Sequence, residues 1–151
     1  MTVVALDDGY PDTMDNEDLI KLLNQDLEME FQSIVQYVQH VATISGAEYA
    51  STVDELKIHL TQELAHATAL AEQISFLGGE PSTHVPDITT APDSRSALEA
   101  DLALETQQLE HYRERVQQAN EAGLADVAEA LRPLLTETQE HVRDLSTALG
   151  L

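Results

Sequence analysis

The sequence predicts an all-α protein, an antiparallel four-helix bundle with a long crossover between its second and third helices. Four long segments place apolar residues at alternating steps of three and four, the spacing of helix faces that pack in a bundle. No segment shows the strict alternation of a β-strand. The 6 glycines and 5 prolines lie mostly before or between these segments, so long helices are permitted.

The first helix is predicted to follow Asp15 or Asn16, because either side chain can cap a helix N-terminus. Its core stripe runs from Ile20 to Ile44. Gly46 then marks a break before the second helix.

The second helix has a core stripe from Tyr49 to Leu77 and is predicted to stop at Gly78-Gly79. The stretch 80–93 contains three prolines and has no helical period, which predicts a linker. Ser96 and Glu99 have the spacing of a capping box and predict the start of the third helix.

The third stripe runs from Leu98 to Ala119, and the fourth from Leu124 to Ala148, with Gly123 between them. Pro133 lies inside the fourth helix, where it is expected to kink or fray the first turns. The turns at 46 and 123 are short, so helices 1–2 and 3–4 should form antiparallel hairpins, and the stretch 80–93 is long enough to cross the bundle. We expect two parts: an N-terminal extension over 1–15 and the bundle over 16–151.

The composition limits the functions open to this chain. Asp and Glu number 28 against 7 Lys and Arg, a net charge of −21, so a nucleic-acid partner is not expected. This charge is either a solvated acidic surface, suited to high salt, or a field that concentrates cations. There is no Cys, so any metal must be held by oxygen and imidazole ligands. No apolar stretch is long enough for a membrane span, and Met1–Tyr10 lacks the basic start of a secretory signal, which favours a cytoplasmic protein without a membrane partner.

A repeat relates the two halves of the chain. Glu30, Tyr37, Glu63 and His66 recur after a shift of 75 residues (105 minus 30, 112 minus 37, 138 minus 63, 141 minus 66). The recurring residues are Glu105, Tyr112, Thr138 and His141. Thr138 stands at the position that corresponds to Glu63, and the other three positions keep the same residue type. Two halves that each carry a carboxylate and then Glu-x-x-His, or its remnant, are typical of a two-metal site in a helical bundle.

Glu30, Glu63 and Glu105 stand at core positions of three different helices. A buried carboxylate costs several kcal/mol unless it is neutralised, paired or bound to a cation. The arginines at 113, 115 and 143 lie off the core stripes, so we do not expect them to pair these acids. Each residue taken alone has an ordinary explanation, a solvated Glu or a hydrogen-bonded His. The shared shift favours a metal site formed by the five residues Glu30, Glu63, His66, Glu105 and His141.

These residues give the chain a resemblance to the ferritin superfamily, and within it to the bacterioferritin branch. The resemblance runs from about residue 16 to the C-terminus, with its most specific stretches at 23–37, 63–67, 76–81 and 101–105. It implies a di-iron centre that oxidises Fe²⁺ with dioxygen or peroxide. By position, Glu30 and His66 would bind one iron, Glu63 would bridge, and Glu105 with His141 would bind the second.

The sequence departs from the family pattern at three points. The family has a second bridging Glu where Thr138 stands, so the second iron should be held more weakly; Glu137, four residues before His141, is a candidate replacement ligand. The family's haem is bound by Met where this chain has Leu64, so no haem is expected. Ten residues follow His141, too few for the fifth helix of the large cages, so we expect a homo-oligomer, at least a dimer, rather than a 24-subunit store.

Other polar residues on or near the stripes have simpler interpretations. Tyr37 and Tyr112 are expected to be core aromatics whose hydroxyls bond a ligand residue, although the family uses a tyrosine at the position of Tyr37 as an electron donor. His59 is interpreted as a solvated side chain, with a place beside the metal site or on the way to it as the alternative. The remaining histidines, His40, His84 and His111, are predicted to be on the surface.

The sequence thus favours a ferroxidase-type oxidoreductase that handles iron or protects against oxidative stress. Two alternatives stay open: a metal-binding protein without turnover that has one strong site and a degenerate second site, and a structural bundle that serves assembly. Mn²⁺ or Zn²⁺ could replace iron, since both accept Glu and His.

Overall fold

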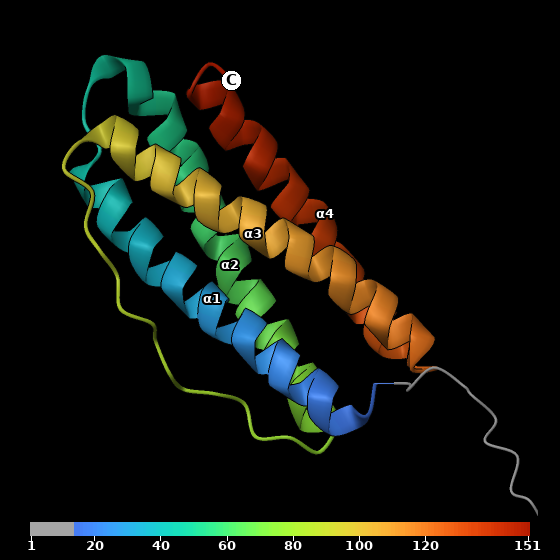
Figure 1. Cartoon of the computed structure of the whole chain (residues 1–151). Helices are drawn as coiled ribbons and strands as arrows, with labels where there is room; N and C mark the ends of the chain where they lie inside the picture. Colours follow the sequence, from blue (N-terminus) through green and yellow to red (C-terminus); the bar gives the residue numbers. More distant parts are fainter. Residues whose placement is uncertain (1–13) are drawn as a thin grey trace, which may run out of the picture.

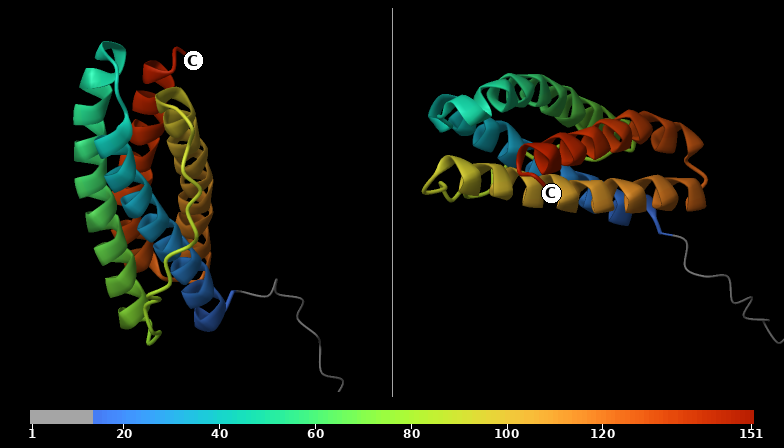
Figure 2. Two further views of the ribbon diagram at one scale, coloured as in Figure 1. Left: turned by 90° about the vertical axis from the view of Figure 1, so that its left-hand side faces the viewer. Right: turned by 90° about the horizontal axis from the view of Figure 1, so that it is seen from above.

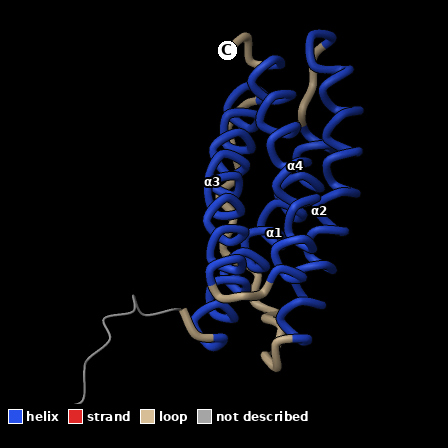
Figure 3. Tube along the Cα trace, turned by 90° about the vertical axis from the view of Figure 1, so that its right-hand side faces the viewer, coloured by secondary structure: helices blue, strands red, loops and turns tan. Residues whose placement is uncertain are grey.

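The computed structural model describes residues 14–151, and within that range the chain is helical with no strand. The helices are α1 (Asn16–Thr43), α2 (Ala50–Phe76), α3 (Ser94–Glu121) and α4 (Ala125–Ala148), with a short 3₁₀ turn η1 (Ala47–Tyr49) before α2. They pack side by side as an elongated bundle (Figure 1; Figure 3). The predicted all-α four-helix bundle is confirmed.

The long connection between α2 and α3 runs the length of the bundle beside α1, so the predicted crossover is present (Figure 1; Figure 2). The connections between α1 and α2 and between α3 and α4 are short. Helix α1 contacts α2 and α3, and α4 contacts the same two helices. The two hairpins therefore pack face to face around one interior.

The helix ends follow local chemistry. Asp15 caps α1 by accepting a 2.8 Å hydrogen bond from the amide of Asp18. Helix α3 begins earlier than predicted, because Asp93 is its cap and accepts a 2.7 Å bond from the amide of Ser96. The predicted capping box at Ser96 was therefore wrong, and Glu99 instead pairs with Arg95 on the helix surface at 3.0 Å.

Gly46 and Gly78 have φ of +111° and +89°, which few residues with a side chain adopt, and both lie at the predicted breaks. Pro133 lies inside α4, and the helix continues through it from residue 125 to 148. No helix within residues 14–151 is both long and apolar enough to cross a membrane. The N-terminal extension predicted for 1–15 falls almost wholly outside the described residues.

The apolar core has two parts. The larger is built around Leu23, Leu70, Val116 and Leu131, and the smaller around Leu56, Leu98 and Leu145. The predicted stripe positions at 30, 63, 105, 138 and 141 are also buried, at 0–1% exposure, although they carry polar groups. The sequence therefore places polar side chains in the interior of the bundle.

Candidate metal centre

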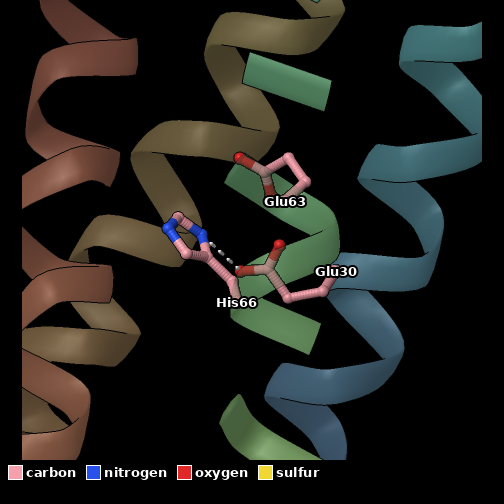
Figure 4. A group of neighbouring side chains, drawn as sticks. All are labelled: Glu30, Glu63 and His66. Atoms are coloured by element: carbon pink, nitrogen blue, oxygen red, sulfur yellow. Dashed lines mark ion pairs between the residues drawn. The ribbon is translucent and has the colours of Figure 1, made fainter. Parts of the chain in front are cut away.

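The five residues singled out by the repeat converge inside the bundle. Glu30 comes from α1, Glu63 and His66 from α2, Glu105 from α3 and His141 from α4. Figure 4 shows Glu30, Glu63 and His66 directed toward one another, with His66 paired to Glu30.

These side chains form two groups of potential metal ligands. Glu30, Glu63 and His66 make the first cluster, and Glu63, Glu105 and His141 the second; in each, one ligand atom per residue lies within 4.8 Å of the others. Glu63 belongs to both, so it has the position of a bridging ligand.

Both histidines direct the same ring nitrogen inward. Nδ1 of His66 lies 3.6 Å from Oε1 of Glu30, and Nδ1 of His141 lies 2.8 Å from Oε1 of Glu63. The outer nitrogens have partners of their own. Nε2 of His66 lies 2.6 Å from Oε2 of Glu137, and Nε2 of His141 lies 2.7 Å from Oε1 of Gln62. Since a carboxylate or an amide oxygen accepts, each Nε2 carries a proton, and each Nδ1 faces the carboxylates of the interior.

The two tyrosines exchange partners between the halves. The hydroxyl of Tyr37 on α1 donates a 2.7 Å bond to Oε1 of Glu105 on α3. The hydroxyl of Tyr112 on α3 donates to Oε1 of Glu30 on α1. The predicted hydroxyl bonds to two of the candidate ligand residues are therefore present, and the second oxygen of each carboxylate has no hydrogen-bond partner within the described residues.

Position 138 faces the same interior. Thr138 is 1% exposed, and its hydroxyl has no hydrogen-bond partner within the described residues. Glu137, the predicted replacement, lies instead on the outer nitrogen of His66 and belongs to neither cluster. Its use as a ligand would require another side-chain conformation and stays a prediction.

Seven buried atoms of this site make no hydrogen bond of good geometry among residues 14–151, although two of them, Nδ1 of His141 and Oε1 of Glu63, lie 2.8 Å apart. They are Oε2 of Glu30, both carboxylate oxygens of Glu63, Oε2 of Glu105, Nδ1 of His66, Nδ1 of His141 and Oγ1 of Thr138. Orphaned polar atoms in a protein interior are rare, and each costs about 1–3 kcal/mol. Carboxylate oxygens and imidazole lone pairs gathered at one point fit divalent cations such as Fe²⁺, Mn²⁺ or Zn²⁺.

The buried carboxyl groups of the centre lie close enough to repel one another when no cation is present. Burial, reinforced by the neighbouring Glu30 and Glu105, holds the pKa of Glu63 well above its usual range. Burial also raises the pKa of the Tyr37 and Tyr112 hydroxyls, with the nearby glutamates adding to the effect, so both tyrosines stay protonated donors. A bound cation would replace the proton on Glu63.

Two buried pairs of a basic and an acidic side chain flank the centre, and sequence reasoning missed both. His40 was predicted to be on the surface but is 2% exposed, with Nδ1 2.8 Å from Oδ2 of Asp101. Arg115, predicted to lie off the core, is buried with its Nε 2.8 Å from Oδ2 of Asp26. A charged residue is stable in the interior when its partner lies opposite, which spacing along one helix does not reveal.

A third partner joins each pair. Gln36 donates a 2.9 Å hydrogen bond to Asp101, and His111, also predicted to be on the surface, has Nδ1 3.2 Å from Asp26 and is only partly exposed. The 75-residue shift relates all of these positions: 26 to 101, 36 to 111 and 40 to 115. Of these positions only 26 and 101 keep the same residue type, so extending the repeat would have found the two aspartates but not the side chains that pair with them. His84 alone of the three lies on the surface as predicted.

The prediction that the His59 side chain is solvated was also wrong. That side chain is buried, and its ring stacks on that of His141 with centroids 4.0 Å apart. This position beside His141 fits the alternative, a place next to the candidate metal centre. Burial and the neighbouring His141 lower the pKa of His59, which keeps the ring neutral.

Comparison with known proteins gives consistent matches. The sequence profile of the ferritin-like domain family matches residues 20–151. The bacterioferritin of Mycobacterium leprae is 25% identical over 135 residues, which cover 89% of this chain and 85% of that protein. A ferritin-like, diiron-carboxylate protein of Bacillus anthracis superposes with a TM-score of 0.84 at 29% identity, covering 90% of this chain and 99% of the other. A dodecameric, bacterioferritin-related thioferritin of Bacteroides fragilis superposes with a TM-score of 0.82 at 28% identity, covering 91% and 88%.

Proposed function

The chain belongs to the ferritin-like domain family, in its bacterioferritin-like branch, and from this premise we propose that it binds two iron ions and oxidises Fe²⁺ with dioxygen or peroxide. The observation that carries the proposal is the set of buried, unpaired oxygen and nitrogen atoms that two clusters share through Glu63. Such a centre would serve iron handling or protection from peroxide.

In this proposal Glu30 and His66 would hold one ion, Glu105 and His141 would hold the other, and Glu63 would be shared between them. Iron held there would supply the electrons that reduce the oxidant. The chain's own residues hold the ions close together and keep the site in a dry interior. Glu137 and Gln62 fix the histidine rings from behind, and Tyr37 and Tyr112 hold the two outer carboxylates.

Anaerobic loading with Fe²⁺ followed by exposure to air tests the proposal. A di-ferric absorbance rise that saturates at two irons per chain is expected, and Glu63→Gln should abolish it because both clusters lose their shared ligand. Glu72→Gln, an exposed change on the same helix, is the matched control. Oxidation no faster than in buffer would count against the proposal.

A second candidate rests on Thr138. Without a second bridging carboxylate, the cluster of Glu105 and His141 has a smaller negative charge to hold its ion. The chain would then be a binding protein with one tightly held metal and little turnover. Metal analysis showing a single ion per chain, together with no oxidation at saturating Fe²⁺, would favour this reading over the first.

We further propose a homo-oligomer of at least two chains in the cytoplasm, with no nucleic-acid or membrane partner and no haem. Exposed apolar side chains on neighbouring helices support an interface, among them Val38 at 53% and Leu64 at 60% exposure. The dodecameric relative from Bacteroides fragilis supports assembly in general. Light scattering during size-exclusion chromatography tests it, since a monomer at micromolar concentration would contradict the proposal.

A further inference from the structure

A second group of ligand-type side chains lies beside the centre, on its side toward the end of the bundle where α2 begins and α4 ends. Figure 1 shows these two helix ends at the same end of the bundle. Glu55 and His59 stand one turn apart on α2, and Asp144 is on α4. One ligand atom from each lies within 4.8 Å of the other two. All three line a pocket of about 480 Å³, and Glu55 is exposed at its rim.

His59 is the buried member of this group, and hydrogen bonds within the described residues satisfy one of its two ring nitrogens. It is 2% exposed, and its Nε2 lies 3.1 Å from Oδ2 of Asp144. Its Nδ1 has no hydrogen-bond partner within the described residues. One ring nitrogen is therefore unpaired in either tautomer, and a buried imidazole in that state is costly.

The internal repeat gives an independent reason to single out this group. The polar groups around the centre have counterparts 75 residues away, but these three do not. Shifted by 75, Glu55 and His59 correspond to Ala130 and Leu134, and Asp144 corresponds to Ala69. These three side chains, two from the first half of the chain and one from the second, are thus an addition to what a symmetric two-metal centre needs.

We infer that Glu55, His59 and Asp144 form a third site for a divalent cation. Two carboxylates and one imidazole are a ligand set that Fe²⁺, Mn²⁺ and Zn²⁺ accept. The ring of His59 stacks on that of His141 with an interplanar angle of 25°, so the ion would sit one imidazole away from the second cluster. Its role as a waiting position for ions bound for the centre rests on the proposed function.

Counting Zn²⁺ by equilibrium dialysis and metal analysis tests the site apart from the centre. The variant Glu30→Gln/Glu63→Gln/Glu105→Gln removes the acids of both clusters with little change of shape and should retain one zinc ion per chain. Adding Glu55→Gln and Asp144→Asn should remove that ion. Adding Glu48→Gln instead, which removes a charge from the same pocket outside the ligand group, should leave it bound.

The zinc counts distinguish failure of the third site from failure of the proposed two-metal centre. If the unaltered chain holds two ions and the triple variant none, the third site is overturned while the centre stands. If no variant and no unaltered chain holds zinc, both are overturned. Zinc that survives Glu55→Gln and Asp144→Asn also overturns the third site. Should the triple variant fail to fold by circular dichroism, the pair of changes in the unaltered chain must lower the count by one relative to Glu48→Gln.

A separate measurement tests whether the third site is a waiting position for ions bound for the centre. With Co²⁺ as the probe and its absorbance as the signal, Glu55→Gln/Asp144→Asn should slow filling of the centre about tenfold and leave its final occupancy unchanged, because the local negative charge that gathers cations is lost. Equal filling rates in this variant and in Glu48→Gln would overturn the role.

Discussion

Ser33 and Gln108 are separated by 75 residues and hydrogen-bond to each other, with Oγ of Ser33 donating to Oε1 of Gln108 over 3.2 Å in the interior between α1 and α3. The same shift relates the two halves of the chain. Positions equivalent under a two-fold operation can touch only where they lie beside its axis. The two halves are therefore related by an approximate two-fold axis between α1 and α3, about which the tyrosine bonds and the flanking pairs exchange partners.

The exchanged tyrosine bonds should stabilise the metal-free chain. Tyr37→Phe removes the donor to Glu105 and leaves another buried carboxylate oxygen unpaired, so it should lower the free energy of unfolding by about 1–3 kcal/mol. Tyr49→Phe, at a half-buried position, should stay within about 0.5 kcal/mol of the unaltered chain. Urea denaturation measures both, and equal effects would show that the Tyr37 hydroxyl contributes nothing.

Thr138 breaks the two-fold relation at its most sensitive point, opposite Glu63. Thr138→Glu should tighten the second ion, raising its affinity at least about tenfold, or about 1.4 kcal/mol. Thr138→Val keeps the shape and removes an unpaired hydroxyl, so it should leave metal binding weak while stabilising the metal-free chain by about 1 kcal/mol. Calorimetric titration with Zn²⁺ compares the three proteins. Identical isotherms would mean that position 138 does not face the second ion.

The raised pKa of Glu63 links folding to pH. Burial and the neighbouring Glu30 and Glu105 make the folded, metal-free chain hold a proton that the unfolded chain releases in the usual glutamate range. The stability gained is fully present below the unfolded pKa of about 4.3 and is lost as pH rises through the raised folded pKa. The free energy of unfolding should therefore fall over that rise in pH, and less so in Glu63→Gln. If the free energy of unfolding changed equally with pH in the unaltered chain and in Glu63→Gln, this linkage would be refuted.

The affinity for metal should change with pH in the opposite direction to the stability of the metal-free chain. Because a cation binds the ionised carboxylate, affinity should increase as pH rises over the same window, and binding should release protons. Calorimetry in two buffers of different ionisation enthalpy counts the protons released. No buffer dependence at neutral pH would mean that Glu63 is already ionised.

The pair of Arg115 and Asp26 is buried, so breaking it should cost far more than breaking a surface pair. Arg115→Met leaves a buried aspartate whose remaining basic neighbour among residues 14–151 is His111, and it should lower the free energy of unfolding by about 3–5 kcal/mol. Arg113→Met removes an exposed pair with Glu110 and should cost less than about 1 kcal/mol. Comparable losses in the two variants would contradict the burial of Arg115.

The fold and the convergence of the candidate ligands could be predicted because both follow from regular spacing along the sequence. The steps of three and four that define the core stripes carry Glu30, Glu63 and Glu105 into the interior along with the leucines around them. The shared shift then links residues that lie on different helices. The short turns and the proline-rich linker fix which helices are neighbours, so the convergence of these acids follows from local signals.

The flanking pairs could not be found in the same way, because a buried charge depends on what lies across the bundle. His40 and Arg115 occupy equivalent positions with different chemistry, so a search for identical residues passes over them. His59 has no equivalent in the other half, and only its contacts with His141 and Asp144 explain its burial. Facing residues on two helices are a tertiary property, and the sequence of one helix carries no direct record of them.

The first cluster draws every ligand from α1 and α2, whereas the second needs α3 and α4. Residues 16–76 therefore already carry one complete ligand set when the later half of the polypeptide is still being translated. A cation captured at that moment would cross-link the nascent hairpin before its partner hairpin emerges. Synthesis in iron-poor and iron-rich cells would then follow different assembly routes to the same bundle.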